Sequence, residues 1–410
     1  MSQDLDTVEI RGITSSGDGV ATLPDGMTVF VPRTAPGDRV TLTRIHRHKR
    51  FARATADKVV VPGPGRVPPP CPHYDRDQCG SCQVMHLDAE TQRAVRARVV
   101  GDALRRLARL EVADPEVVPA DQQLGYRAKV TFAVQSGRIG FHRTGRPEEV
   151  FEVERCLLAR PALQELHSGV RRARGHLPPD ATRLVLREDA DGGLHVIVET
   201  PGGRAWQGGG AFHRVLASSG LKATIWWHPA DGAPRAVAGS DTPWPATVFE
   251  QVHPAMGRTV RAAAIAALGD VTGAVVWDLY AGIGDATALL AGAGALVTSV
   301  ESDPRAVAFA ESLGPAGPVR WQGKVEERLG QLPQPDAVLT NPPRTGMSAE
   351  VTAAINASPA DRVVYISCDP ATLARDITRL AERYRLVAVR AFDQFPQTTH
   401  VECVAVLEPR

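Results

Sequence analysis

The chain has 410 residues, of which 43% are hydrophobic and 23% are charged, and its formal net charge is +1. This size predicts two or three domains, and this composition excludes a disordered, fibrous or membrane-spanning chain. Residues 1–6 form neither a basic nor an apolar leader, so we expect a cytoplasmic protein with no membrane partner. The six cysteines then favour metal binding or catalysis over a disulfide framework.

Residues 5–60 alternate apolar and polar positions in short runs separated by turn signals such as Ser15–Gly19. This pattern predicts a five-stranded β-barrel of the oligonucleotide-binding type over residues 1–62. The stretch Arg44–Arg53 has five Lys or Arg residues and no acid, and it falls on the fourth expected strand and the following turn. Its charge suits an RNA backbone, although a charge run is more often a solvated face.

Three cysteines lie close together, Cys71, Cys79 and Cys82, and Cys156 follows much later. Three local thiolates with one distant ligand are typical of a cubane cluster, whereas structural zinc sites more often pair two Cys-x-x-Cys units. By spacing alone, an iron–sulfur cluster, a zinc ion and no metal all remain open.

The cysteines belong to a predicted β-rich central domain over residues 63–245. An arginine-rich helix is predicted over about residues 86–110, with helical spacing of its apolar positions. Strand patterns with glycine-rich turns follow it, at residues 129–134, 137–141, 183–187 and 194–199.

From residue 246 to residue 410, strand and helix patterns alternate. This order predicts a Rossmann-like α/β domain with a doubly wound, largely parallel sheet. The expected strands are 274–279, 296–300, 336–340, 362–367, 385–391 and 402–407.

A glycine turn containing Gly282 follows the first of these strands, and Glu301 ends the second. Glycine lets a ligand approach a helix N-terminus, and an acidic residue at this distance can hold two ribose hydroxyls. A third glycine, expected for a pyrophosphate, is replaced by Thr287, so the pattern favours S-adenosylmethionine over a dinucleotide. A glycine turn without Glu301 would be an ordinary strand-to-helix connection.

Three further side chains are expected at the same sheet edge. Asn341 ends a strand before two prolines, which forbid a helix there and hold its side chain toward the cofactor. Cys368 stands between a buried strand and a helix N-terminus, where a thiolate is favoured, although a buried cysteine without a chemical role also suits that position. Glu402 opens the last strand and can serve as general base for a nucleophilic Cys368.

Together with Phe249–Val252, these motifs and the four early cysteines occur in an order that resembles the bacterial RNA uracil-5 methyltransferases. The resemblance covers nearly the whole chain and includes the family's TRAM barrel. It implies an RNA partner, a monomeric enzyme, and a helix over residues 90–115 that packs on the methyltransferase domain.

The resemblance also implies roles for individual residues. Cys368 would be the nucleophile and Glu402 the base. The implied contacts to S-adenosylmethionine are Gln251, Tyr280, Asp285 and Glu301, and the ligands of a [4Fe–4S] cluster are Cys71, Cys79, Cys82 and Cys156.

This chain departs from the family's usual residues at several positions. Asn341 replaces an aspartate, and Asp285 and Asp369 replace asparagines, while the interval between Cys71 and Cys79 is longer. Asn341 can donate as well as accept a hydrogen bond, which would change how a pyrimidine edge is read. The alternatives are therefore an RNA methyltransferase acting on cytosine or an amino group, and a non-catalytic RNA-binding factor.

Overall fold

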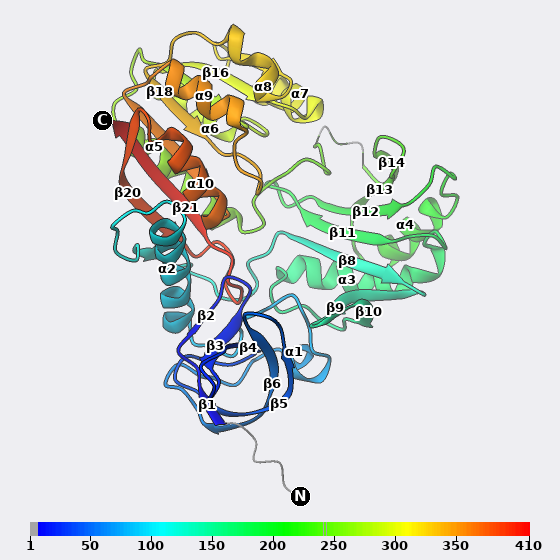
Figure 1. Ribbon diagram of the computed structural model, residues 1–410. Helices are drawn as coiled ribbons and strands as arrows, with labels where there is room; N and C mark the ends of the chain where they lie inside the picture. The colour runs from blue at the N-terminus through cyan, green and yellow to red at the C-terminus, as the bar shows by residue number, and fades with distance from the viewer. Residues whose placement is uncertain (1–6, 241, 243) are drawn as a thin grey trace, which may run out of the picture. The chain divides into compact units, whose positions relative to one another are not determined.

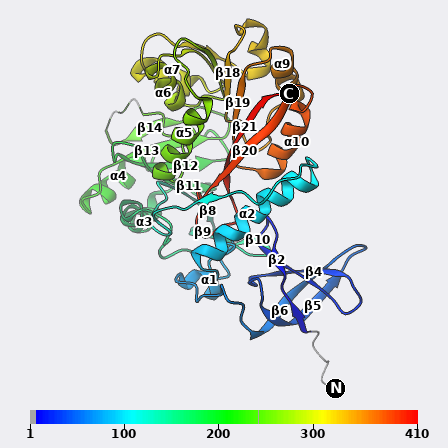
Figure 2. The ribbon, with the colours of Figure 1, turned by 90° about the vertical axis from the view of Figure 1, so that its left-hand side faces the viewer.

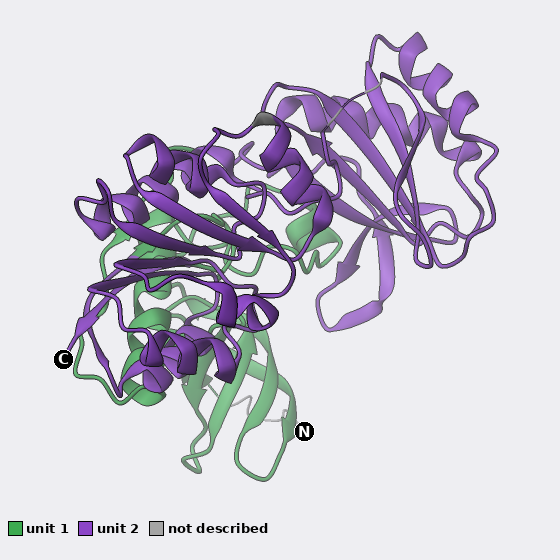
Figure 3. Ribbon diagram, turned by 90° about the horizontal axis from the view of Figure 1, so that it is seen from above, with its two compact units in different colours: residues 1–123, 391–401 green, residues 124–390, 402–410 purple. Residues whose placement is uncertain are grey.

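The computed structural model describes residues 7–240, 242 and 244–410, so residues 1–6 lie outside the described part. The chain forms two compact units (Figure 3). Unit 1 contains residues 1–123 and 391–401, and unit 2 contains residues 124–390 and 402–410. Neither unit is continuous in sequence, because the segment 391–401 returns to unit 1 shortly before the chain ends.

Unit 1 begins with a six-stranded sheet in the order β1-β5-β6-β4-β3-β2 (Figure 1). Its inward side chains form an apolar core that includes Val29, Val31, Val40 and Leu42. The strands are β1 (Thr7–Glu9), β2 (Gly12–Ile13), β3 (Asp18–Thr22), β4 (Thr28–Pro32), β5 (Arg39–Arg47) and β6 (Ala52–Val61).

The prediction of five strands is wrong by one, because two short strands, β1 and β2, precede β3. Val8 pairs with Val40 of β5, whereas Gly12 pairs with Val20 of β3. Strands β1 and β2 are therefore the two edges of the sheet. Because they are close together in sequence, the sheet must curl to bring its edges near one another. The basic stretch Arg44–Arg53 falls on the end of β5, the start of β6 and the connection between them.

The rest of the first 123 residues supplies α1 (Pro72–Arg76), α2 (Ala89–Arg106) and β7 (Val117–Val118). Helix α2 is shorter than predicted at both ends, and its start is set by the Asp88 side chain, which accepts the Thr91 N–H. Apolar residues of the cysteine-containing segment and of α2, among them Val84 and Val95, share a core with the curled sheet.

Unit 2 contains a seven-stranded central sheet in the order β10-β9-β8-β11-β12-β13-β14. Helices α3 and α4 were not predicted, nor were β10, β13 and β14. One face of the sheet packs on a helix, where the Phe132 ring stacks on His167 of α3 with 4.4 Å between ring centroids. The elements are β8 (Lys129–Gln135), β9 (Arg138–Arg143), β10 (Arg146–Glu152), α3 (Pro161–Ala173), a short 3-10 helix (Arg174–His176), β11 (Arg183–Glu188), β12 (Leu194–Thr200), α4 (Gly209–Ser218), β13 (Ala223–Pro229) and β14 (Arg235–Ala238).

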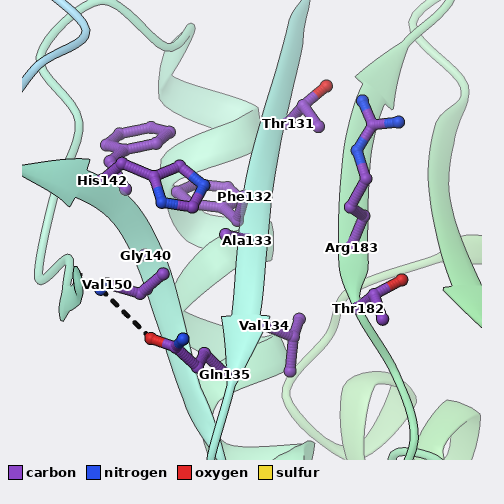
Figure 4. Close-up of a pocket in the computed structure, with 11 residues that line it drawn as sticks. Thr131, Phe132, Ala133, Val134, Gln135, Gly140, His142, Val150, Thr182 and Arg183 are labelled. Carbon is purple, nitrogen blue, oxygen red and sulfur yellow. Dashed lines mark hydrogen bonds between the residues drawn. The ribbon is translucent and has the colours of Figure 1, made fainter. Parts of the chain in front are cut away.

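A hollow of about 390 Å³ lies over β8, β9 and β11 of this sheet (Figure 4). Its lining includes Thr131, His142 and Arg183, and the Gln135 side chain accepts the Val150 N–H at its rim. None of the predicted site residues lines it.

The C-terminal sheet has the order β17-β16-β15-β18-β19-β21-β20-β7, and β7 pairs with Ala391 and Phe392 at the end of β20. Strands β15 to β19 are parallel, and β21 is antiparallel to β19. All six predicted strands are present, and β17 was not predicted. The strands are β15 (Val275–Leu279), β16 (Leu296–Glu301), β17 (Val319–Gln322), β18 (Ala337–Thr340), β19 (Arg362–Ser367), β20 (Tyr384–Phe392) and β21 (Glu402–Pro409).

Helices lie on both sides of this sheet, as expected for a doubly wound fold. Figure 2 shows α5 on one side of β18, β19 and β21, with α9 and α10 on the other. No helix among the described residues is long and apolar enough to cross a membrane. The helices are α5 (Pro254–Leu268), α6 (Asp285–Gly292), α7 (Pro304–Leu313), α8 (Val325–Arg328), a short 3-10 helix (Leu329–Gln331), α9 (Ala349–Ala357) and α10 (Pro370–Leu380).

Candidate active site

Cys368 and Glu402 meet at the end of the antiparallel pair β19 and β21. The last register pair joins Ser367 to Cys403, so Cys368, in the bend just after β19, and Glu402, the first residue of β21, come directly beyond that pair. The Glu402 carboxylate raises the pKa of Cys368, as expected for two groups that lie near one another. The fold therefore brings together the predicted nucleophile and the predicted base.

The Glu402 carboxyl group is almost fully buried, with 2% of the residue exposed. Its Oε2 atom has no hydrogen-bond partner among the described residues. Burial raises the pKa of Glu402 to about 8, against the smaller opposing effect of Arg344. A carboxyl group with a pKa near the working pH is well suited to remove a proton during a reaction.

The Cys368 thiol is partly buried at the same edge. Burial raises its pKa first, the Glu402 carboxylate raises it further, and Arg344 lowers it. The guanidinium of Arg344 therefore favours the charged form of both groups. Arg344 was not among the predicted site residues, although it directly follows the predicted Asn341-Pro-Pro turn.

The loop that contains Arg344 is fastened to helix α10 by Asp376, which is fully buried. The Asp376 carboxylate accepts the Tyr365 hydroxyl and the Met347 N–H, each at 2.8 Å. Arg375 pairs with the same carboxylate and donates to the Thr345 carbonyl at 2.7 Å. Because α10 begins just after Cys368, this cluster holds the Arg344 loop and the cysteine on one framework.

The predicted cofactor residues gather at the carboxyl ends of β15, β16 and β18. The Glu301 carboxylate accepts the Gly282 N–H at 2.8 Å and the Asp303 N–H at 2.8 Å. A Cβ atom added at Gly282 would meet nothing within 4 Å, so the turn leaves open space for a ligand. Tyr280 adopts a φ of 62°, which is uncommon for a residue with a side chain and is typical of a functional turn.

Thr287 explains why the third glycine is absent. Its hydroxyl donates to the buried Asp278 carboxylate at 2.5 Å. Burial raises the pKa of Asp278 to about 6, and the bond from Thr287 opposes that rise. Asp278 was not singled out as a site residue. It lies in β15 and Thr287 lies in α6, so their bond ties together the two elements that the glycine turn joins.

The other predicted cofactor residues surround this turn. Asp285 opens α6 and pairs with Arg261 of α5 at 2.9 Å. The Asn341 N–H donates to the Leu279 carbonyl at 3.1 Å, which places Asn341 beside the glycine turn. Gln251 packs against Gly257, where an added Cβ atom would lie 2.9 Å from the Gln251 Cβ.

The segment before Gln251 is held by a buried arginine of the central sheet. Arg187 is 2% exposed and donates to the carbonyls of Ala246 and Val248, each at 2.7 Å. It also pairs with Glu250. Gln251 therefore follows directly on a segment that the central sheet fixes in place.

Comparisons with known proteins show the family of this chain. A family model described as tRNA (Uracil-5-)-methyltransferase matches residues 330–410. A 23S rRNA (uracil(1939)-C(5))-methyltransferase RlmD from Chromohalobacter salexigens is 31% identical, with 98% of this chain and 89% of that protein covered. The chain belongs to the RNA uracil-5 methyltransferase family.

Two further similarities extend over almost the full length of the chain. An uncharacterised RNA methyltransferase from Streptomyces avermitilis is 32% identical, with 98% of both chains covered. The crystal structure of a Pyrococcus abyssi tRNA (uracil-54, C5)-methyltransferase, in complex with S-adenosyl-L-homocysteine, has a TM-score of 0.73 and 22% identity, with 97% of this chain and 99% of that chain covered. That second similarity shows a common fold.

The family defines the reaction of this class I methyltransferase: transfer of a methyl group from S-adenosylmethionine to carbon 5 of a uracil in RNA. A uracil target is therefore favoured over cytosine or an amino group, and an enzyme over a non-catalytic RNA-binding factor.

The structure does not show the predicted metal site of this methyltransferase. Cys71, Cys79 and Cys82 lie in unit 1, and Cys156 lies in unit 2. In the described part of the chain, no group of three or more His, Cys, Asp or Glu side chains is arranged to hold a metal ion. The four-cysteine cluster and its zinc alternative remain predictions.

Proposed function

We propose that this protein methylates carbon 5 of a uridine in ribosomal RNA through a covalent bond between Cys368 and the base. The observation that carries the mechanism is the proximity of Cys368 and Glu402 at the end of the paired strands β19 and β21. The relatives named 23S rRNA (uracil(1939)-C(5))-methyltransferase, which match almost the full chain, support ribosomal RNA as the substrate.

A nucleophile is needed because carbon 5 of uracil is itself poorly nucleophilic. Addition of the Cys368 thiolate to carbon 6 forms an S–C6 bond and turns the ring into an enolate, with its electron pair available at carbon 5. Arg344 supports this step because its charge favours the thiolate over the thiol. Carbon 5 then takes the methyl group.

Glu402 completes the reaction as general base. Its carboxylate removes the proton from carbon 5, the S–C6 bond breaks, and the Cys368 thiolate leaves. Burial supports this role by raising the pKa of Glu402 toward the working pH.

S-adenosylmethionine, when bound, supplies the electrophilic methyl group. The open space at Gly282 and the Glu301 carboxylate, which accepts the Gly282 N–H, fit a ribose-bearing ligand at this turn. Gln251, Tyr280, Asp285 and Asn341 are the remaining candidates to orient it, and they come from different elements around the turn.

The curled sheet is proposed to hold the RNA, as a TRAM-like domain. The tip between β5 and β6 exposes basic side chains, among them Lys49 and Arg50. The Phe51 ring stacks on His48 at 4.6 Å between centroids. Positive charge with an aromatic platform is the combination that binds single-stranded nucleic acid, and the target base must leave its stack to reach the active site.

Transfer RNA is the second candidate substrate, favoured by the description of the family model that matches residues 330–410. Nucleoside mass spectrometry of separated ribosomal and transfer RNA, from cells with and without the gene, tests both. We expect 5-methyluridine to fall in ribosomal RNA only. A fall in transfer RNA would reassign the substrate, and an unchanged 5-methyluridine content in both fractions would contradict the proposed function.

A [4Fe–4S] cluster held by the four predicted cysteines rests on the sequence resemblance alone. Protein purified without oxygen is expected to be brown, with absorption near about 400 nm. A colourless protein containing zinc would favour the alternative. No step of the proposed reaction depends on this group.

A further inference from the structure

The segment from Asp393 to Val401 joins β20 to the catalytic strand β21 without regular secondary structure. Asp393, Gln394, Thr398 and Thr399 are at most 3% exposed. A buried loop must satisfy its backbone polar groups with other parts of the protein. Helix α2, about 300 residues earlier in sequence, supplies several of those partners, and Val84 and Val118 supply others.

Arg96 of α2 is fully buried, and its guanidinium is directed at the loop. It donates to the carbonyls of Thr398 at 2.8 Å, Phe395 at 3.2 Å and His400 at 3.2 Å, and it pairs with the Asp393 carboxylate at 3.2 Å. The planar fork of arginine can reach several acceptors at once, which a lysine ammonium cannot match in geometry.

One turn earlier on α2, Gln92 forms a reciprocal pair with the loop. Its Nε2 donates to the Gln397 Oε1, and its Oε1 accepts the Gln397 N–H, both at 2.9 Å. Gln397 has a φ of 72°, so these bonds hold a backbone conformation that a residue with a side chain rarely adopts. Gln92 and Arg96 therefore hold the loop at its middle and at its end.

The loop ends at Val401, directly before Glu402, the first residue of β21. The Glu402 Oε2 lacks a hydrogen-bond partner in the described part of the chain, so backbone geometry must aim the carboxylate. We propose that Arg96, supported by Gln92, is a positioning residue that sets the catalytic base Glu402 through the loop 393–401. This inference rests on the proposed role of Glu402.

Displacement of Glu402 should affect only the removal of the carbon 5 proton. Formation of the S–C6 bond and methyl transfer use Cys368 and the cofactor turn, whereas removal of the carbon 5 proton uses Glu402. A displaced base therefore leaves the methylated ring bonded to Cys368, with its carbon 5 proton in place. The signature is an accumulating protein–RNA adduct that survives denaturation.

The test uses Arg96→Lys, which keeps the charge beside Asp393 but loses the fork, and Gln92→Met, which keeps the size but loses the paired bonds. Both full-length variants react with unmodified substrate RNA and S-adenosylmethionine. We expect kcat to fall about 10- to 100-fold, an unchanged KM for S-adenosylmethionine, and a denaturation-stable adduct. Arg98→Lys is the matched control, since Arg98 is exposed on the same helix and pairs only with Asp102 among the described contacts.

Glu402→Gln separates this inference from the proposed function. If Glu402→Gln accumulates the adduct and neither Arg96→Lys nor Gln92→Met does so, the positioning role is wrong and the proposed mechanism stands. If Glu402→Gln turns over normally without adduct, the proposed base is wrong. If one of the two α2 variants does not fold, the other decides.

Discussion

Cys368 and Glu402 come together at the end of two antiparallel strands, directly beyond the pair formed by Ser367 and Cys403. Side chains alternate between the faces of a strand, so Glu402 points away from the face that Cys403 occupies. A nucleophile and a base that lie near one another can act on adjacent atoms of one ring. This relationship requires β21 to run antiparallel in an otherwise parallel arrangement.

The nucleophile is tested by Cys368→Ala. We expect loss of methyl transfer by at least about a thousandfold and no covalent adduct, because carbon 5 cannot be activated. Methyl transfer is measured with labelled S-adenosylmethionine and full-length RNA. Cys403→Ala is the control, since Cys403 is fully buried on the opposite face and should retain activity. An active Cys368→Ala enzyme would refute the covalent mechanism.

The pH profile of the enzyme tests the base. The reacting form of Glu402 is the carboxylate, so kcat/KM is expected to rise with pH through the pKa of about 8. A profile that is flat over this range would argue against Glu402.

The same pKa has an opposite effect on stability. Folding raises the pKa of Glu402 from 4.5 to about 8, so the folded state binds more protons than the unfolded state between these values. The contribution of Glu402 to the stability of the folded state is present at low pH and is lost as the pH rises through the folded pKa. As the pH rises from about 5 to about 8, the unfolding free energy of the Glu402→Gln variant should therefore increase relative to that of the parent. The expected increase is on the order of 1 kcal/mol or more. Thermal unfolding across this range measures the difference, and a constant difference would contradict it.

Arg344 is expected to assist the thiolate. Arg344→Gln removes the charge that lowers the pKa of Cys368, so the pKa of the thiol should rise and adduct formation should slow about 10- to 100-fold. The rate of Cys368 alkylation as a function of pH reports that pKa directly. Arg344→Lys keeps the charge and should recover part of the rate. Identical alkylation profiles in all three proteins would exclude the effect.

Thr287 is expected to stabilise the cofactor turn. Thr287→Val keeps the shape but leaves the buried Asp278 carboxylate without its 2.5 Å hydrogen bond, which should cost about 1–3 kcal/mol of unfolding free energy. Weaker S-adenosylmethionine binding, measured by calorimetry, should accompany the loss. Thr287→Ser retains the hydroxyl and is the control. Equal stability of the valine and serine variants would show that the bond contributes little.

The basic tip of the curled sheet should contribute to RNA binding through charge. Lys49→Ala and Arg50→Ala should each weaken affinity and reduce the salt dependence of binding by about one released ion. The kcat at saturating RNA should stay unchanged, because neither residue belongs to the reacting groups. Binding isotherms at several salt concentrations measure the slope. A lower kcat with an unchanged slope would place these residues in another role.

Local patterns in the sequence determined much of this protein. Strand and helix alternation predicted the methyltransferase sheet, and Gly282, Glu301 and Cys368 were singled out because each lies at or just after the end of a recognisable strand. Short-range chemistry is sufficient there, since a buried parallel strand, a glycine turn and a helix start each have their own residue pattern. The sequence did not predict the helices α3 and α4 or the sixth strand of the curled sheet, because their patterns are short or interrupted.

Only the tertiary structure decided which distant residues act together. The pairing of β21 with β19 brings Glu402 near Cys368, the buried Asp376 ties the Arg344 loop to α10, and Arg96 reaches carbonyls about 300 residues away. A buried charge is stabilised only by the particular partners that the fold supplies, and sequence spacing does not reveal those partners. Local patterns therefore determined what each residue type can do, and long-range packing decided where it does so.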